Sequence, residues 1–451
     1  MARKRGPTPS AGDPSGSEPG RESKPRRRRD GGAKSSSRRT GGRADVPRRP
    51  AGPPPEPRAA LSNAGGEVQL RGHDAYVIPL RRAMEAATAE ARGLEIQYFH
   101  SYPARMHPEL ARVALAEFAP GPSPTLLDPF CGGGTTIVEG MRAGWRTLGS
   151  DLNPLALDLA RVRSRRVNAK ARARFVETVE AVADASEERV RTRVDIRADL
   201  PKEEREWYEV HVLKELAGLL AEIQRVADEE DRRALQMVFS SLVVKFSRQK
   251  ADTSSQRIDK RIRKGLPTEF FVRKSEELVR AWAELDEACP EKTRRPRLVA
   301  SDARKLGHTL SGDFRADLIL TSPPYGGTYD YVQHHARRFA WLGYKSAAFE
   351  RGEIGSRREL TRAAAGDAAR RWDAQLGEVL DSLHDRLRPG RIALLLLGDA
   401  QVGGRRVEAD RQIEALAPKH GFEFGAAASQ SRVDYAGGTD RREHLLALLR
   451  S

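Results

Sequence analysis

Two loops in this 451-residue sequence carry residue types at spacings that could do chemistry. The first reads Asp128-Pro129-Phe130-Cys131-Gly132-Gly133-Gly134-Thr135-Thr136. Glycines directly after a strand let the backbone pass close to a ligand. The loop lacks the Gly-Lys-Ser/Thr ending of a P-loop and the G-x-G-x-x-G spacing of a dinucleotide fold. Asp151 ends the next predicted strand, where an acidic side chain can accept hydrogen bonds from ribose hydroxyls. The combination predicts a nucleoside ligand without a pyrophosphate.

The second loop reads Thr321-Ser322-Pro323-Pro324-Tyr325 and follows another apolar run. Its two prolines stiffen the loop and remove two backbone donors, which leaves carbonyl oxygens free to accept hydrogen bonds. The Ser322 hydroxyl can accept in the same way, and Tyr325 offers a face for stacking. We interpret this loop as a rigid seat for the exocyclic amino group of a base.

The elements that must position these loops form an interrupted α/β pattern. Strands are predicted at 125–128, 147–151, 297–301, 316–320, 391–398, 423–428 and 444–449. Helices are predicted at 78–91, 108–118 and 135–143, and the chain from 155 to 288 has helical periodicity almost throughout. We therefore expect one parallel-sheet domain, in two parts at 66–160 and 296–451, interrupted by a helical insert at 161–295.

Charge is concentrated in two segments of a chain whose net charge is +16. Residues 1–65, rich in Pro, Gly, Ser and Arg, are predicted to be a disordered basic tail, either an arm that binds nucleic acid or a solubilising tail. The insert carries eight Lys or Arg and two Asp between Lys245 and Lys264. A basic chain favours a polyanionic partner. We expect nucleic acid to bind Lys245, Arg248, Lys250, Arg257, Lys260 and Arg261, although a solvated helical face would have the same composition.

Other classes of protein are disfavoured by composition. No run of about 18 apolar residues could span a bilayer. The two cysteines, Cys131 and Cys289, are too few for a disulfide framework or a four-cysteine zinc site, and we expect a cytoplasmic protein. His334 and His335 are adjacent and would point in different directions on a helix, so no metal site is expected.

The paired loops resemble those of the S-adenosylmethionine-dependent DNA amino-methyltransferases, the N4-cytosine and N6-adenine family. The resemblance covers roughly residues 95–160 and 297–450. It rests on Asp128–Thr136, on Ser322–Tyr325, on Tyr102-Pro103-Ala104-Arg105 upstream, and on Leu387-Arg388-Pro389-Gly390. It implies a Rossmann-like methyltransferase sheet and S-adenosylmethionine as the cofactor. The implied cofactor-binding residues are Tyr102, Asp128, Phe130, Cys131, Gly132, Gly134, Thr135, Asp151 and Asp302.

The resemblance implies that Asp151 binds the ribose, that Asp302 contacts the adenine ring, and that the catalytic residues are Ser322, Pro323, Pro324 and Tyr325. A flipped base would stack on Tyr325 and donate its amino hydrogens to Ser322 and to the Pro323 carbonyl. C5-cytosine chemistry is disfavoured because the second loop has no cysteine, and Cys131 is interpreted as a small packing residue.

The expected substrate is double-stranded DNA, with cytosine N4 favoured because the loop begins with Ser where N6-adenine enzymes more often have Asp. The alternatives are N6-adenine methylation of DNA, guanine-N2 methylation of RNA, and a non-catalytic DNA-binding protein on the same fold. A cognate restriction endonuclease is a possible partner. The family usually places target recognition beside the catalytic loop, whereas the long insert here lies between the Asp151 and Asp302 strands, so no recognition residue is carried over.

Overall fold

The computed structural model describes the chain from Ala64 onward with short gaps. The described residues are 64–88, 90–102, 105–194, 196–252, 254, 256–328, 330–362, 364–432 and 441–451. The chain divides into two units, Met1–Pro57 and Arg58–Ser451, and all described residues belong to the second. The predicted tail, residues 1–65, thus lies outside the described residues except for its last two.

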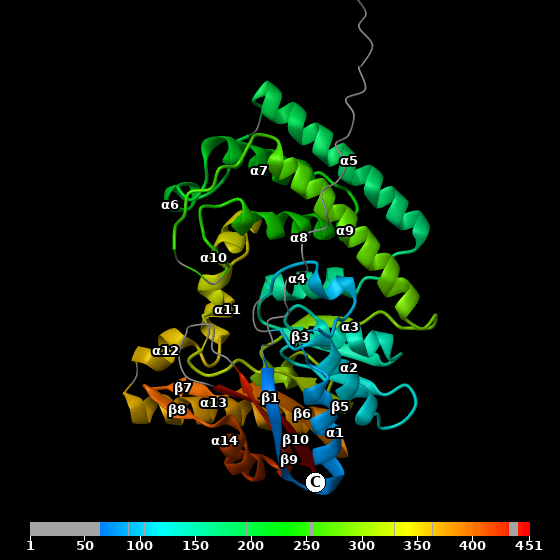
Figure 1. Cartoon of the computed structure of the whole chain (residues 1–451), viewed down its shortest axis with the longest axis vertical. Helices are drawn as coiled ribbons and strands as arrows, with labels where there is room; N and C mark the ends of the chain where they lie inside the picture. Colours follow the sequence, from blue (N-terminus) through cyan, green and yellow to red (C-terminus); the bar gives the residue numbers. More distant parts are fainter. Residues whose placement is uncertain are drawn as a thin grey trace, which may run out of the picture. The chain divides into compact units, whose positions relative to one another are not determined.

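Within the described residues, eight strands form one mixed sheet (Figure 1). Its order is β1 (Ala64–Gly72), β9 (Phe422–Arg432), β10 (Arg441–Arg450), β6 (Leu387–Gly398), β5 (Ala316–Thr321), β2 (Thr125–Asp128), β3 (Arg146–Asp151), β4 (Arg297–Ala300). The strands from β6 to β4 are parallel. β10 runs antiparallel to β6 and β9, and β1 runs antiparallel to β9. The predicted α/β class is therefore confirmed.

Alternating residues of the central strands enter different cores, because successive side chains point to opposite faces of a sheet. Leu126 packs on one face with helices α1 (Asp74–Glu85) and α2 (Pro108–Glu117). Leu127 packs on the other face with α13 (Ala365–Arg386), α14 (Ala409–Leu416) and the short helices η2 (Ala303–His308) and η3 (Ala417–His420). Both faces are thus buried, as a parallel sheet requires.

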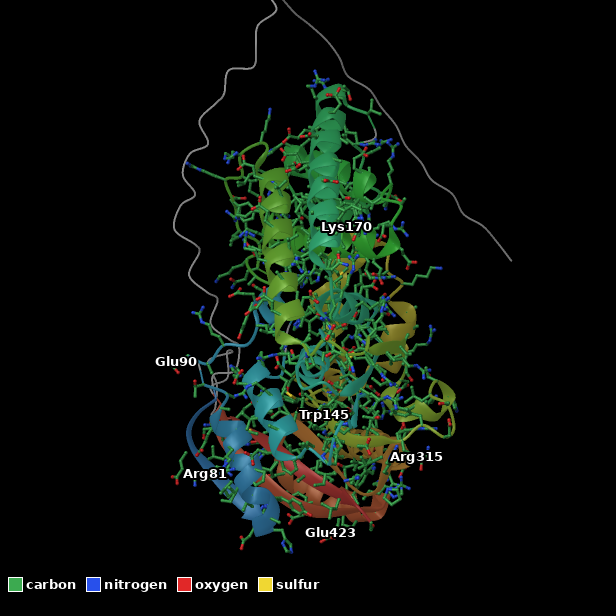
Figure 2. All side chains as sticks on the ribbon, turned by 90° about the vertical axis from the view of Figure 1, so that its right-hand side faces the viewer. Arg81, Glu90, Trp145, Lys170, Arg315 and Glu423 are labelled. Atoms are coloured by element: carbon green, nitrogen blue, oxygen red, sulfur yellow. The ribbon has the colours of Figure 1, made fainter. Side chains whose placement is uncertain are left out.

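The secondary-structure elements of the described chain between β3 and β4 are helices, apart from an isolated β-bridge between Gln249 and Arg257. The helices are α4 (Pro154–Arg163), α5 (Ala169–Thr192), α6 (Lys202–Arg205), α7 (Val210–Ile223), α8 (Glu229–Lys245) and α9 (Leu266–Ala288). The long helices α5 and α9 lie side by side (Figures 1 and 2), and Trp282 of α9 packs edge-on against Phe175 of α5. The predicted boundaries of this insert, 161 and 295, stay a prediction, since one unit includes both sides.

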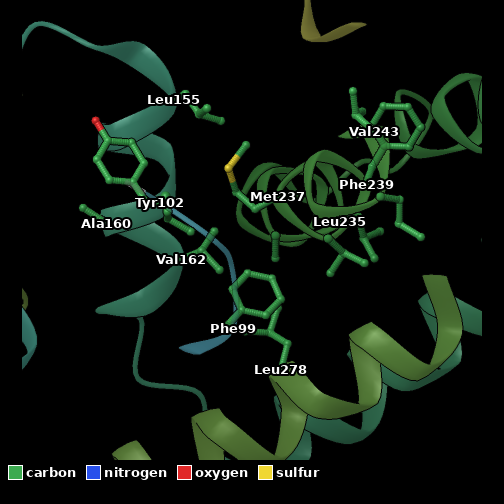
Figure 3. Close-up of a cluster of buried hydrophobic side chains, with 14 of the residues drawn as sticks. Phe99, Tyr102, Leu155, Ala160, Val162, Leu235, Met237, Phe239, Val243 and Leu278 are labelled. Carbon is green, nitrogen blue, oxygen red and sulfur yellow. The ribbon is translucent and has the colours of Figure 1, made fainter. Parts of the chain in front are cut away.

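The core of these helices continues into the rest of the unit. One buried cluster joins Leu235 and Phe239 of α8 to Leu155 of α4 and to Phe99 and Tyr102, near the short helix η1 (Glu95–Tyr98) (Figure 3). The same cluster includes residues of α3 (Thr135–Arg142) and of α10 (Tyr331–Leu342). The insert is therefore packed directly against the helices that surround the two loops.

Several predicted elements differ from those observed. Strand β1 was missed because, among its described side chains, only Val68 is buried, whereas Leu70 is exposed and the remaining positions are polar or glycine. The first helix is Asp74–Glu85 rather than 78–91, and it includes Pro79. The hairpin of β7 (Ala400–Val402) and β8 (Arg405–Val407) was also missed, as were the short helices α11 (Ala347–Gly352) and α12 (Arg357–Arg362). None of the helices in the described part of the chain is long and apolar enough to cross a membrane.

Candidate active site

Two adjoining pockets open where β2, β3, β4 and β5 end. One is lined by Tyr102, Pro129, Phe130, Gly132, Asp151, Leu152, Ser301, Asp302, Ala303, Ser322, Pro324, Tyr331, Phe349, Gly352, Glu353 and Ile354. We call it the nucleoside pocket. The other, the turn pocket, is lined by Tyr102, Arg105, Met106, Asp128, Phe130, Cys131, Gly132, Gly133, Thr135, Thr136 and Ser322. Ligands of parallel sheets bind at this edge, and here residues from both predicted loops meet.

Asp128 ties the ends of two strands together. Its Oδ1 accepts hydrogen bonds from the Thr321 hydroxyl at 2.6 Å and from the Phe130 amide at 3.1 Å, and its Oδ2 accepts from the Thr136 hydroxyl. Burial raises the pKa of Asp128 to about 6, although these hydrogen bonds oppose the rise. Asp128 was predicted to bind the cofactor; it borders the turn pocket, with both oxygens engaged by the protein.

The glycines of the turn serve two different needs. Gly132 has φ +48° and lines both pockets, and a Cβ there would lie 3.3 Å from Cε1 of Tyr102. Gly134 precedes α3 with φ +85°, and a Cβ there would lie 3.0 Å from the Cβ of Ala160 on α4. Gly134, although predicted as a cofactor residue, is absent from the lining of both pockets and instead allows α3 and α4 to pack closely. Cys131 and Thr135 line the turn pocket.

Asp151 ends β3 and faces the nucleoside pocket. Its Oδ2 accepts a hydrogen bond from the Gly132 amide at 2.9 Å, and its Oδ1 accepts from the Asn153 amide at 2.8 Å. Burial raises the pKa of Asp151 to about 6, against the effect of these two bonds. An ionised carboxylate here keeps further lone pairs for ligand hydroxyl groups.

Tyr102 and Arg105 form the wall between the turn pocket and the helices. The Tyr102 ring stacks on His335 of α10, with 5.1 Å between the ring centroids. Arg105 donates to the carbonyl of Gln97 and lies over the Tyr98 ring, while its buried Nε has no hydrogen-bond partner. Burial lowers the pKa of Arg105. Pro103 and Ala104, between them, lie outside the described residues.

Asp302 follows β4 and lines the nucleoside pocket, as expected for an adenine contact. Its carboxylate is already paired with Arg304, whose Nη2 lies 2.7 Å from Oδ2 and whose Nε lies 3.0 Å from Oδ1. Burial disfavours the charged form, but the bonds from Arg304 outweigh it and lower the pKa of Asp302. Asp302 is therefore a fixed, ionised acceptor.

The second loop contributes its residues unequally. Ser322 lines both pockets, and Pro324 lines the nucleoside pocket. Pro323 is buried and lines neither. Tyr325 is half-buried beside the pockets, and its hydroxyl donates to Oε1 of Glu443 at 2.5 Å. Tyr331, at the start of α10, also lines the nucleoside pocket.

Part of the nucleoside pocket comes from a segment that sequence reasoning did not assign. Phe349, Gly352, Glu353 and Ile354 all line it. Glu353 accepts a hydrogen bond from the Tyr331 amide at 2.9 Å, and burial raises the pKa of Glu353 to about 7. No motif marks these residues, because their spacing is that of an ordinary amphipathic stretch.

Arg163, also missed, supports the glycine-rich turn from behind. It is fully buried at the end of α4, where Nη1 donates to the Gly133 carbonyl at 3.1 Å and Nη2 donates to the His100 carbonyl at 2.6 Å. A Cβ on Gly133 would lie 2.5 Å from Nη1, which explains the glycine. Arg163 belongs to a run with Arg161 and Arg165 that has the composition of a charged helix face, so no sequence pattern distinguished it from them.

The predicted nucleic-acid segment, from Lys245 to Lys264, begins at the last residue of α8. Lys260 donates its ammonium hydrogens to the carbonyls of residues 244, 245 and 249, and so caps the end of that helix. Arg257 donates to the Glu206 carbonyl and lies over the Trp207 ring. Lys245 lies over the Phe270 ring and Lys250 bonds to Gln256. Arg248 and Arg261 make no side-chain contact of these kinds within the described residues.

Comparisons with known proteins give a short sequence match and distant structural ones. No family model matches the chain. A 68-residue stretch is 37% identical to the type II methyltransferase M.MvaI of Kocuria varians, and it covers 15% of each chain. TrmN from Thermus thermophilus aligns at 13% identity over 77% of this chain and 49% of its own, with a TM-score of 0.31. The rRNA methyltransferase AviRa from Streptomyces viridochromogenes aligns at 15% identity over 81% and 96%, with a TM-score of 0.33.

Proposed function

We propose that this protein transfers a methyl group from S-adenosylmethionine to an exocyclic amino group of double-stranded DNA, with cytosine N4 favoured over adenine N6. The observation that carries the proposal is the place of Ser322, which lines both the nucleoside pocket and the turn pocket. An acceptor for an amino group therefore adjoins a site suited to a nucleoside cofactor. The short match to a type II methyltransferase supports the reaction class.

The residues of the pockets fit S-adenosylmethionine. Asp151 would accept from the ribose hydroxyls and Asp302 from the adenine amino group, and the apolar side chains of Leu152 and Ile354, which line the same pocket, would suit the adenine ring. Arg105, a half-buried cation that lines the turn pocket, suits the carboxylate of the methionine end. The cofactor supplies a methyl group bonded to a positively charged sulfur.

The second loop orients the acceptor nitrogen. A base rotated out of the duplex stacks on Tyr325 and donates its two amino hydrogens to the Ser322 hydroxyl and the Pro323 carbonyl. Both acceptors are held on a loop stiffened by prolines, so the nitrogen lone pair is directed at the methyl group for in-line transfer. As the new N–CH3 bond forms, the S–CH3 bond breaks to leave a thioether, and one amino proton is released to solvent.

The insert supplies the contact with the DNA backbone. Its basic segment carries the proposed phosphate contacts Lys245, Arg248, Lys250, Arg257, Lys260 and Arg261. Arg248 and Arg261 are the best candidates for phosphate contacts, because the other four cations already have partners in the protein. The chain's net charge of +16 favours the same partner.

The test is methyl transfer from tritiated S-adenosylmethionine to unmethylated duplex DNA, with mass spectrometry of the nucleosides. We expect N4-methylcytosine, and N6-methyladenine would identify the alternative base. Ser322→Ala should lower turnover at least about tenfold, because it removes one acceptor for the amino group. The control is Ser311→Ala, at an exposed serine, which should match the wild type. Label in RNA alone would contradict the DNA assignment, and absence of cofactor binding would indicate a non-catalytic protein.

A further inference from the structure

The ring of Tyr325 is seated by two residues more than 70 positions away in the sequence. Its hydroxyl donates to Oε1 of Glu443 at 2.5 Å. Its ring edge lies over Gly398, where a Cβ would approach Cε2 to 2.6 Å and Cδ2 to 2.7 Å. Any side chain at position 398 would therefore displace the ring or be displaced by it.

The two residues are partners in the sheet. Gly398 ends β6 and pairs with Glu443 of β10 in the antiparallel ladder. Residues directly opposite each other project their side chains from the same face of a sheet. The glycine leaves that face open, the Tyr325 ring occupies the space, and its hydroxyl reaches the carboxylate on the neighbouring strand. Glu443 is 6% exposed, so this contact is largely shielded from water.

The rest of the loop is held against neighbouring elements. The Gln401 amide of β7 donates to the Gly326 carbonyl at 3.0 Å. Gly327 has φ +69° and lies against the Gln401 carbonyl, which would be 1.8 Å from a Cβ. Arg441 of β10 donates to the Thr328 hydroxyl at 3.1 Å. The loop backbone is thus fixed, and the remaining freedom of Tyr325 is rotation of its side chain.

We propose that Glu443 and Gly398 are positioning residues for Tyr325, which together set the plane of the ring against which the methyl-accepting base stacks. The inference rests on the proposed function. A hydrogen bond to a carboxylate is stronger than one between neutral groups, so it restrains the ring in one orientation. Tyr325, Gly398 and Glu443 all lie outside the linings of both pockets, so their loss should leave cofactor affinity unchanged.

The experiment measures kcat and KM for DNA, together with the dissociation constant for S-adenosylmethionine. Glu443→Ala should lower kcat about tenfold, with the cofactor dissociation constant within about twofold of the wild type. Glu443→Gln should keep most of the activity, because its amide oxygen still accepts from the phenol. Tyr325→Phe should lose a similar factor, and the Tyr325→Phe/Glu443→Ala double variant should lose no more than the worse single variant. Gly398→Ala should behave like Glu443→Ala.

Two controls separate positioning from general damage. Glu423→Ala removes an exposed glutamate of β9 (Figure 2), and Gly312→Ala adds a methyl group where nothing lies within 4 Å. Both should match the wild type. Unchanged kcat in Glu443→Ala, or additive losses in the double variant, would overturn the inference.

A structural measurement tests the position of the Tyr325 ring without any substrate. A crystal structure of Glu443→Ala should show the Tyr325 ring rotated from its place over Gly398, and an unmoved ring would overturn the inference. This measurement keeps the two proposals apart. A wild-type protein that binds S-adenosylmethionine but methylates no DNA would contradict the proposed function, whereas the ring position would still decide the role of Glu443.

Discussion

Protonation of Asp151 should weaken the binding of S-adenosylmethionine as the pH falls through about 6. The buried carboxylate titrates at that pH in the free protein because burial disfavours its charged form. In the proposed complex the ribose hydroxyls donate to the carboxylate, so the cofactor should bind the ionised form and hold its pKa lower than in the free protein. Above pH 7 the dissociation constant should therefore be constant.

The size of the effect follows from the free-protein pKa. One pH unit below a pKa of about 6, only about a tenth of the protein is ionised at Asp151, so the dissociation constant at pH 5 should be about tenfold higher than at pH 7.5. Asp151→Asn removes the titration and one acceptor. The variant should bind about tenfold to a hundredfold more weakly at pH 7.5, and its dissociation constant should be flat between pH 5 and pH 7.5.

Isothermal titration calorimetry at pH 7.5, 6 and 5 measures these constants, with Asp128→Asn as the matched control. Asp128 also has a pKa of about 6, but its oxygens bond within the protein, so this variant should keep the pH dependence. A flat wild-type profile, or a pH dependence that persists in Asp151→Asn, would refute the reasoning.

The weaker binding of S-adenosylmethionine at pH 5 should not result from acid unfolding at Asp128 or Asp151. The pKa values of Asp128 and Asp151 are raised in the folded protein above the ordinary value of 3.8. A raised pKa means that the contribution of each group to stability is fully present below pH 3.8 and is lost as the pH rises through about 6. Acidification from pH 7.5 to pH 5 therefore favours the folded state at these two positions, and thermal unfolding at each pH checks this directly.

Gly134→Ala should lower the free energy of unfolding by about 2–5 kcal/mol, because it combines a left-handed backbone at φ +85° with a methyl group 3.0 Å from Ala160. Thermal or denaturant unfolding measures the loss, and a variant as stable as the wild type would contradict the prediction. Arg248→Ala and Arg261→Ala should each reduce the slope of log affinity for duplex DNA against log salt by about 0.9, as expected for one phosphate contact. Arg191→Ala, at an exposed arginine of α5, is the control, and unchanged slopes in all three variants would remove both arginines from the DNA interface.

The strands that carry the two loops could be predicted from the sequence. Short segments with consecutive Leu or Ile residues, followed by loops rich in Gly or Pro, identified β2 and β5 closely, with residues 125–128 and 316–321 observed. The types of residue at Asp151 and Ser322 indicated their chemistry, and parallel strands then place them at one edge of the sheet. Such signals are local, since each depends on residues within one loop or strand.

The remaining part of the site depends on contacts between distant segments, which no local pattern encodes. The sequence does not show that Lys260 caps α8. A cation expected to bind nucleic acid instead donates hydrogen bonds to carbonyls of its own chain. The sequence also does not show that Glu353 reaches the nucleoside pocket. Packing decides these outcomes, because burial and hydrogen bonding are set by whichever segments meet in the folded chain.

Tyr325 combines a feature that is visible in the sequence with one that depends on the tertiary structure. The sequence alone determined that an aromatic ring follows a rigid Ser-Pro-Pro loop at the end of a strand. Only the tertiary structure decided how that ring is held, because the register of β6 against β10 brings Gly398 and Glu443 to the same face. Register is fixed by the pairing of whole strands, so the space over a glycine and the carboxylate beside it exist only once the sheet has formed.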